Sequence, residues 1–264
     1  MASAASAIKS AALRLMPDAV LLRFKKVRYL GAIRSFWSPE AAIMAALVRP
    51  GDHVLDVGAH AGWYTRVLAE AAGPGGRVYS VEPIPPTFTL LSFCVRRLGL
   101  GNVTLFNCAA SRENGRASME VPEYPTGGEN FYRASLLTPE PGTGPTRSFS
   151  VDVRTVDSLL GTPPPRITFI KVDVEGHEAE ALAGAAATIA RDHPALCVEV
   201  TGDPDAPGSG SQTLFADLAA HGYRAYWLDG GRLVARRPGD RSVNYFFVTA
   251  AHLEALEARG RQIG

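Results

Sequence analysis

The chain of 264 residues has little cysteine, little lysine and no long apolar run. Its three cysteines are scattered and lack the spacing of a metal site, which argues against a disulfide framework and suits a reducing compartment. No apolar run approaches the roughly 20 residues that span a bilayer. The Ala-rich start does not resemble a signal peptide, because Arg14 and Asp18 interrupt any apolar segment. We therefore expect a cytoplasmic protein.

A large excess of charge of either sign is also missing. The net charge of +1 argues against nucleic acid as a partner, because binding to phosphates needs a basic excess. Residues 1–38, however, carry seven basic residues against Asp18, a net of +6, which leaves −5 for the remainder since the total is +1. We expect a basic helical N-terminal extension over 1–38. It either contacts an anionic membrane or an acidic ligand, or packs on the domain with its basic residues in solvent; the irregular apolar pattern favours packing.

From residue 53 onward, apolar strand-like runs alternate with helical patterns. The runs predict strands at 53–57, 77–83, 102–110, 167–174 and 195–201, and helical spacing predicts helices at 63–72, 86–99, 178–192 and 212–222. Apolar strands in repeated β-α-β order predict an α/β fold, a doubly wound Rossmann-like parallel sheet with helices on both faces. No linker divides the chain, so we expect a single domain over 39–264.

Two regions depart from this alternation. Residues 112–153 are rich in Gly, Pro, Ser and Thr, with strand-like pieces at "RASMEV" and "RSFSVDV", and predict a long excursion that contains a hairpin. Loops of this length are often functional. Near the end, "GYRAYWLDGGRLVARR" and "SVNYFFVTA" predict two strands joined by an Asp-Gly turn and then a third strand.

The sharpest motif is "VLDVGAHAGWYT" at 54–65, a strand, a glycine turn and the start of a helix. Gly58 permits a tight turn, and the helix start offers unpaired N–H groups to a ligand. The dinucleotide fingerprint fails because His60 occupies the position of its middle glycine. Glu82 ends the next strand and can accept hydrogen bonds from both ribose hydroxyls, while Asp56 can meet an ammonium group or order the turn. A ribose with an amino-acid tail indicates S-adenosylmethionine rather than NAD.

Seven stretches together resemble the FkbM-type methyltransferases. They are "VLDVGAHAGWYTRVLAE", "VYSVEPIPPTFTLL", "NVTLFNCAAS", "VRTVDSLL", "FIKVDVEGHEAEALAGA", "ALCVEV" and "NYFFVTA". The resemblance implies a class I methyltransferase sheet of seven strands, the last antiparallel, and methyl transfer from S-adenosylmethionine to a hydroxyl of a sugar, polyketide or similar metabolite. It also implies a cofactor site in which the methionine end meets Asp56, Gly58, His60 and Gly62, the ribose meets Glu82, and the adenine is flanked by Asn107 and Ala109.

The segment "IKVDVEGHEAEAL" at 170–182 places charges in an apolar strand. If the strand alternates to its end, Lys171, Asp173 and Glu175 share one face, and the two carboxylates open onto the ligand crevice at its carboxyl end. An alcohol acceptor must lose a proton, so Asp173, Glu175 and His177 are candidate general bases, and Asp173 can instead orient the cofactor. For Lys171 we expect an internal ion pair, because an unpaired buried ammonium is unfavourable.

Metal and acceptor are less constrained by the sequence. Glu199, near the next strand end, could hold Mg²⁺ together with Asp173 or could pair with Lys171; two carboxylates are thin evidence, so we predict no metal site. The acceptor would lie under the 122–147 excursion, against Tyr124, Asn130, Phe131, Tyr132 and Arg133, unless these residues only pack the loop. Two alternatives stay open: a membrane-surface enzyme acting on a lipid-linked sugar, and a binding module without activity. The sequence predicts no oligomeric state.

Overall fold

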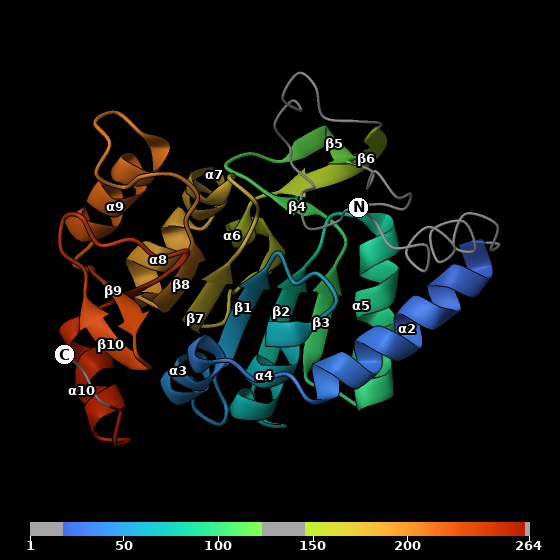
Figure 1. The fold of residues 1–264 in the computed structure, drawn as a ribbon, viewed down its shortest axis with the longest axis horizontal. Helices are drawn as coiled ribbons and strands as arrows, with labels where there is room; N and C mark the ends of the chain where they lie inside the picture. Colours follow the sequence, from blue (N-terminus) through green and yellow to red (C-terminus); the bar gives the residue numbers. More distant parts are fainter. Residues whose placement is uncertain (1–17, 123–145, 262–264) are drawn as a thin grey trace, which may run out of the picture.

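The computed structural model describes residues 18–122 and 146–261 (Figure 1). The first 17 residues of the predicted N-terminal extension and the aromatic cluster proposed to face the acceptor, residues 124–133, lie outside these ranges. The side chains of residues 18–25 are likewise not described.

The described elements begin with two helices, and strands and helices then alternate except in the excursion and near the end of the chain. They are α2 (Asp18–Arg34), α3 (Pro39–Leu47), β1 (His53–Val57), α4 (Trp63–Ala72), β2 (Arg77–Val81), α5 (Pro85–Leu98), β3 (Val103–Phe106), β4 (Ala109–Ala110), β5 (Gly115–Pro122), β6 (Thr146–Arg154), α6 (Val156–Leu159), β7 (Ile167–Val172), α7 (Glu178–Ala183), α8 (Ala186–Asp192), β8 (Ala195–Glu199), α9 (Gly210–Ala220), β9 (Arg224–Asp229), β10 (Arg232–Ala235), β11 (Asn244–Val248) and α10 (Ala250–Glu257).

The main sheet has the strand order β10-β9-β11-β8-β7-β1-β2-β3. The five strands from β8 to β3 run parallel, which confirms the predicted Rossmann-like core. Strand β11 inserts antiparallel between β8 and β9, and β10 pairs antiparallel with β9 through the predicted Asp229-Gly230 turn. The described sheet therefore has one strand more than the seven that the family resemblance implies, because β10 extends the edge as a hairpin partner.

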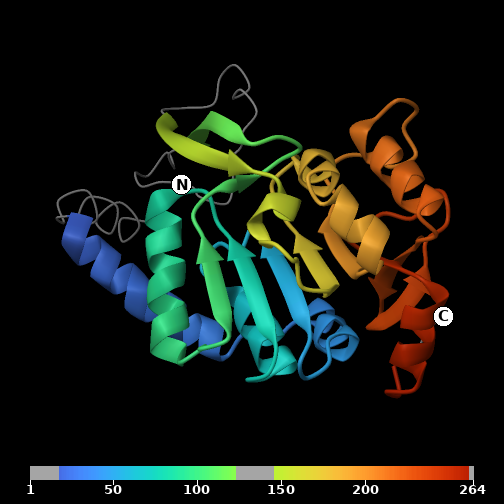
Figure 2. The ribbon, with the colours of Figure 1, turned by 180° about the vertical axis from the view of Figure 1, so that it is seen from behind.

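Helices cover both faces of this sheet, as Figures 1 and 2 show from opposite sides. Helices α3, α4 and α10 bury Met44, Leu68 and Leu256 against one face. Helices α6 to α9 pack on the other face, where Ile189 and Leu214 join a core with the strand residues Leu55, Ile170 and Leu196. Strand residues thus alternate between two cores, and burial on both faces explains why these strands are nearly all apolar.

The predicted helix 178–192 is two helices, α7 and α8, broken at Gly184 and Ala185. A Cβ at Gly184 would lie 2.0 Å from the carbonyl oxygen of Ser111. The chain after β4 therefore packs directly on the break, a contact that the helical periodicity of the sequence does not reveal.

The predicted strand 102–110 is also divided. Strand β3 ends at Phe106, and Ala109–Ala110 leave the main sheet as β4 to pair with β6 in a second, three-stranded sheet of order β4-β6-β5. The side chain of Asn107 donates hydrogen bonds to the carbonyl oxygens of Glu82 and Pro83, 2.8 and 2.9 Å away, where the chain changes direction. Strands β5 and β6 form the hairpin predicted for the 112–153 excursion.

Helix α2, the described part of the basic extension, packs on the domain near α5 (Figure 1). Ile33 is fully buried against Leu90 and Cys94 of α5 and against Ala61 of the glycine turn. Within the described ranges, no helix has the length and apolar character needed to cross a membrane.

Candidate cofactor and methyl-transfer site

A cavity of about 510 Å³ opens at the carboxyl ends of β1, β2, β7 and β8. This edge of an open α/β sheet is where ligands bind, and the volume lies in the range of cofactor pockets. The lining divides into four groups: the glycine turn with Glu82, apolar residues before α5 and in the small sheet, aromatic residues before α3 and at the start of α4, and carboxylates after β7 and at the end of β8. The lining includes Phe36, Gly58, His60, Trp63, Tyr64, Glu82, Ile84, Ala109, Met119, Asp173, Glu175, His177 and Glu199.

The glycine turn depends on Gly58, whose φ is +85°. A Cβ at this position would lie 1.7 Å from the carbonyl oxygen of Asp173, so only glycine allows β1 and the end of β7 to approach so closely. The amides of Gly58 and Ala59 both donate to the carbonyl oxygen of Val81, 2.9 Å away. His60 follows in the left-handed region, with φ +48°, and its ring lines the cavity.

Glu82 closes the turn from β2. Its two carboxylate oxygens accept hydrogen bonds from the amides of His60 (3.0 Å) and Ile84 (2.9 Å). Burial raises the pKa of Glu82 to about 7, although the two amide donors favour the charged form and oppose the rise. Each oxygen keeps a further acceptor position, so the carboxylate can still accept bonds from ligand hydroxyls.

Three predicted cofactor residues do not line the cavity. Asp56 lies 1% exposed beneath the turn, where its Oδ2 accepts a 2.6 Å hydrogen bond from Thr65 and so ties β1 to α4. Gly62, with φ +99°, is the N-cap of α4, and Asn107 holds the loop after β2. These residues shape the site, whereas Gly58, His60, Glu82 and Ala109 reach the cavity itself.

The predicted internal ion pair of Lys171 is confirmed. Its side chain is 2% exposed, and its Nζ lies 2.7 Å from Oδ2 of Asp173 and 4.6 Å from the ring centroid of Tyr64. Burial would lower the pKa of Lys171, but the negative charges of Asp173 and Asp56 outweigh burial and raise it.

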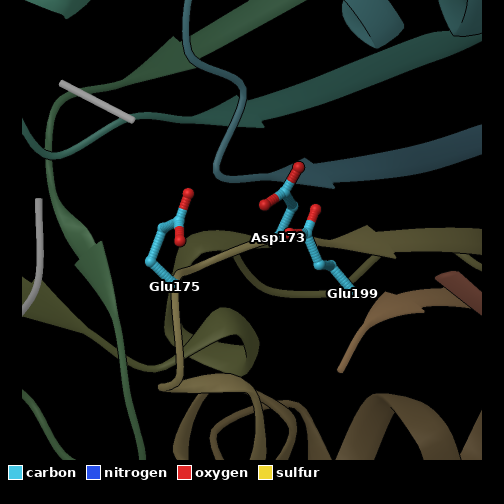
Figure 3. A group of neighbouring side chains, drawn as sticks. All are labelled: Asp173, Glu175 and Glu199. Atoms are coloured by element: carbon cyan, nitrogen blue, oxygen red, sulfur yellow. The ribbon is translucent and has the colours of Figure 1, made fainter. Parts of the chain in front are cut away.

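Two further carboxylates meet Asp173, as Figure 3 shows: Glu199 from β8 beside it, and Glu175 from the chain after β7. One carboxylate oxygen from each of the three residues lies within 4.8 Å of the oxygens of both others. The prediction that strand alternation brings Glu175 to the cavity is wrong. Strand β7 ends at Val172, and Glu175 has a left-handed backbone conformation, with φ +53°. The absence of a metal stays a prediction, because such acidic groups are common without an ion.

His177, the third candidate base, lines the cavity but is engaged elsewhere. Its Nε2 lies 3.0 Å from Oγ of Ser111, and the neighbouring Glu180 pairs with Arg112. Burial lowers the pKa of His177, which Glu180 partly offsets. The contacts His177–Ser111 and Glu180–Arg112 therefore hold the start of the excursion against α7, and His177 is placed to position that loop.

Sequence patterns missed an aromatic wall, which we define as Phe36, Trp63 and Tyr64. Phe36 contacts both others edge-on, with ring centroids 5.2 Å apart in each case. All three line the cavity. Trp63 and Tyr64 directly follow the glycine turn, which was an available signal, whereas Phe36 comes from the connection between α2 and α3 and gave none.

The side chains that line the cavity fit S-adenosylmethionine, the cofactor that the sequence indicates. Glu82 can accept bonds from a ribose, Ile84, Ala109 and Met119 offer an apolar surface to a purine, and the carboxylates suit a positively charged sulfur.

Comparison with known proteins agrees with this chemistry. The model of the family described as the methyltransferase FkbM domain matches residues 56–225, more than half of the chain. Protein-L-isoaspartate O-methyltransferases are similar over short stretches: that of Ignicoccus hospitalis is 41% identical over 63 residues, 24% of this chain and 30% of that protein, and that of Aeropyrum pernix is 60% identical over 37 residues, 14% of each. The match thus spans less than a third of these curated relatives.

Among solved structures, a methyltransferase FkbM from Methylobacillus flagellatus KT aligns with a TM-score of 0.47 and 21% identity, over 75% of this chain and 43% of that one. An S-adenosylmethionine-dependent O-methyltransferase from Thermotoga maritima aligns with a TM-score of 0.45 and 14% identity, over 83% of this chain and 69% of that one.

Proposed function

The chain belongs to the FkbM methyltransferase family, and from this premise we propose that it transfers a methyl group from S-adenosylmethionine to a hydroxyl of a small molecule or glycan. The observation that carries the proposal is the composition of one cavity. This cavity contains a glycine turn and Glu82, which suit the cofactor, together with carboxylates and an aromatic wall, which suit an acceptor.

At the cofactor end, Glu82 would hold the ribose and the turn from Gly58 to His60 would hold the amino-acid tail. When bound, S-adenosylmethionine supplies a methyl carbon already activated by a positively charged sulfur. The chain's residues then need mainly to align the acceptor oxygen, and orientation of this kind can lower a barrier by up to roughly 7–11 kcal/mol.

At the acceptor end, Asp173 is oriented by Lys171 and stands with Glu199 and Glu175 beside the aromatic wall. A carboxylate within hydrogen-bond reach of the acceptor hydroxyl can orient it and take its proton. The flat faces of Trp63 and Phe36 can pack against the apolar face of a ring-shaped acceptor. The isoaspartate substrate named for the curated relatives does not transfer to this chain, because the match covers less than a quarter of it.

The test is an acceptor panel with methyl-labelled S-adenosylmethionine. Monosaccharides, nucleotide sugars and polyketide alcohols are each paired with the corresponding deoxy compound, an amine and a thiol. We expect label on hydroxylated members only, and loss of turnover by at least about 100-fold in Asp173→Asn. The matched control is Asp217→Asn, an exposed carboxylate on α9, which should leave turnover unchanged. Labelling of the amine or thiol alone, or full turnover in Asp173→Asn, would contradict the proposal.

A second candidate is action at a membrane surface on a lipid-linked sugar. Supporting it, Val27 and Trp37 are 67% and 72% exposed, and Arg28 and Arg34 are exposed beside them. Aromatic and basic side chains on one segment favour an anionic membrane interface. Co-sedimentation with phosphatidylserine vesicles should fall in the variant Val27→Ser/Trp37→Ser relative to the unaltered chain. Equal sedimentation of both proteins, or none of either, would remove this candidate.

A further inference from the structure

The carboxylates beside Lys171 outnumber the positive charges near them. Asp173 and Glu199 lie side by side with Glu175, and Lys171 contacts Asp173. Two carboxylates at this separation, partly shielded from water, resist being ionised together, so one proton is shared by the pair.

The surroundings identify Glu199 as the residue that carries this proton. The pKa of Glu199 is raised to about 8, and burial is the largest cause. The negative charge of Asp173, and the hydrogen bond that a protonated Glu199 donates to it, add to the rise. Lys171 opposes this rise, but its ammonium is held by Asp173. The facing residue on β11 is the neutral Asn244. The charged and titratable groups around Glu199 and its Lys171–Asp173 partners come from seven parts of the described chain. They are Glu40 of α3, Asp56 of β1, His60 of the glycine turn, Tyr64 of α4, Glu82 after β2, Glu175 and Glu178 after β7, and Cys197 of β8.

We propose that Glu199 exchanges its proton for the positive charge of the cofactor. In the ligand-free protein Glu199 is protonated and donates to Asp173. Binding of a sulfonium in the cavity that both carboxylates line supplies the missing positive charge, and Glu199 then releases its proton. This inference rests on the proposed function, and it assigns Glu199 a role that the strand pattern did not predict.

The exchange also identifies the group that accepts the acceptor's proton. During transfer, Glu199 takes up the hydroxyl proton as the acceptor oxygen forms its bond to the methyl carbon and the carbon–sulfur electron pair stays on sulfur. The sulfur becomes neutral as Glu199 becomes neutral, so the net charge of the site is the same before and after the reaction. A base with a pKa close to the working pH is well suited to this step.

Isothermal titration calorimetry of the full chain tests the exchange directly. S-Adenosylmethionine and S-adenosylhomocysteine are titrated near pH 7 in phosphate and in Tris with EDTA, and the difference in heat between buffers gives the number of protons released. The two ligands share the same amino-acid tail and differ in the sulfur charge, so the tail's contribution cancels. We expect binding of S-adenosylmethionine to release close to one proton more than binding of S-adenosylhomocysteine. The affinity for S-adenosylmethionine should increase as the pH is raised toward about 8, by up to about tenfold per pH unit, and the affinity for S-adenosylhomocysteine should not.

Two variants assign the proton to its residue. Glu199→Gln should bind both ligands and lose the difference in proton release, whereas Glu175→Gln, the third carboxylate of the group, should retain it. Equal proton release for the two ligands in the unaltered chain overturns the inference and needs no variant. Retention of the difference in Glu199→Gln overturns it as well. Failure of both ligands to bind overturns the proposed function, and this inference with it.

Discussion

Removal of Lys171 gives the most direct test of how the charged strand is stabilised. Lys171→Met keeps an unbranched side chain of similar size inside the core but removes the ammonium. Asp173 then loses its 2.7 Å partner, and the cation–π contact with Tyr64 at 4.6 Å is lost. Breaking a fully buried pair costs about 3–5 kcal/mol. The side chain of Asp173 is 26% exposed, so water stabilises the remaining charge, and we expect the free energy of unfolding to fall by about 2–3 kcal/mol.

The reciprocal variant leaves a different group without its partner. Asp173→Asn leaves the 2% exposed ammonium of Lys171 with the charge of Asp56 and with Glu199, which can ionise once the charge of Asp173 is gone. The variant should cost about 3 kcal/mol. The double variant removes both charges and should lie within about 2 kcal/mol of the unaltered protein. The cycle therefore predicts a coupling energy of at least about 3 kcal/mol between the two positions.

Urea unfolding near pH 7, followed by circular dichroism with unchanged denaturant slopes, measures all four free energies. The control is the pair Arg116 and Asp152, whose side chains are 79% and 59% exposed and whose coupling should stay below about 1 kcal/mol. Additive effects of Lys171→Met and Asp173→Asn, within about 0.5 kcal/mol, would refute the argument that each charge is held by the other.

Three further predictions concern the turn and its neighbours. Gly58→Ala should lower the free energy of unfolding by more than about 4 kcal/mol. The control Gly51→Ala has a similar φ of +92° but open space around the added Cβ, and should lower it by only about 1–2 kcal/mol. Equal effects of the two variants in urea unfolding would contradict the steric argument. Glu82→Gln should weaken S-adenosylmethionine binding about 10- to 100-fold in calorimetry, and an affinity within about twofold of the unaltered protein would exclude Glu82 as the ribose ligand. Burial lowers the pKa of His60 to about 4, from 6.5 in the unfolded chain. The neutral form of His60 therefore favours folding above pH 6.5, and this contribution to stability is lost as the pH falls from 6.5 toward 4. His60→Asn should therefore lose less stability over that interval than the unaltered protein, and parallel pH profiles would contradict this.

Local patterns in the sequence were sufficient for the parallel core and for part of the site. The short apolar runs and the glycine turn predicted β1, β2, β7 and β8, because strand burial and tight turns depend on residues a few positions apart. An internal ion pair for Lys171 was also predicted, because a buried ammonium needs a partner, but the only partner named from the sequence was Glu199, whereas the structure pairs Lys171 with Asp173. By the open-sheet rule, the same strands also indicated which edge of the sheet holds the cavity.

Contacts between distant segments depend on how the helices and strands pack, and the sequence patterns did not predict them. Glu199 meets Asp173 because β8 pairs with β7, and Phe36 joins Trp63 because the chain before α3 packs across the glycine turn. The helix break at Gly184 depends on the Ser111 carbonyl, and the division of strand 102–110 depends on pairing with β6, more than 40 residues later. Near neighbours in the sequence were enough to predict most strands, helices and turns, but not where the helix 178–192 and the strand 102–110 divide. The acid pair and the aromatic wall arise from packing between elements, whose partners no local pattern specifies.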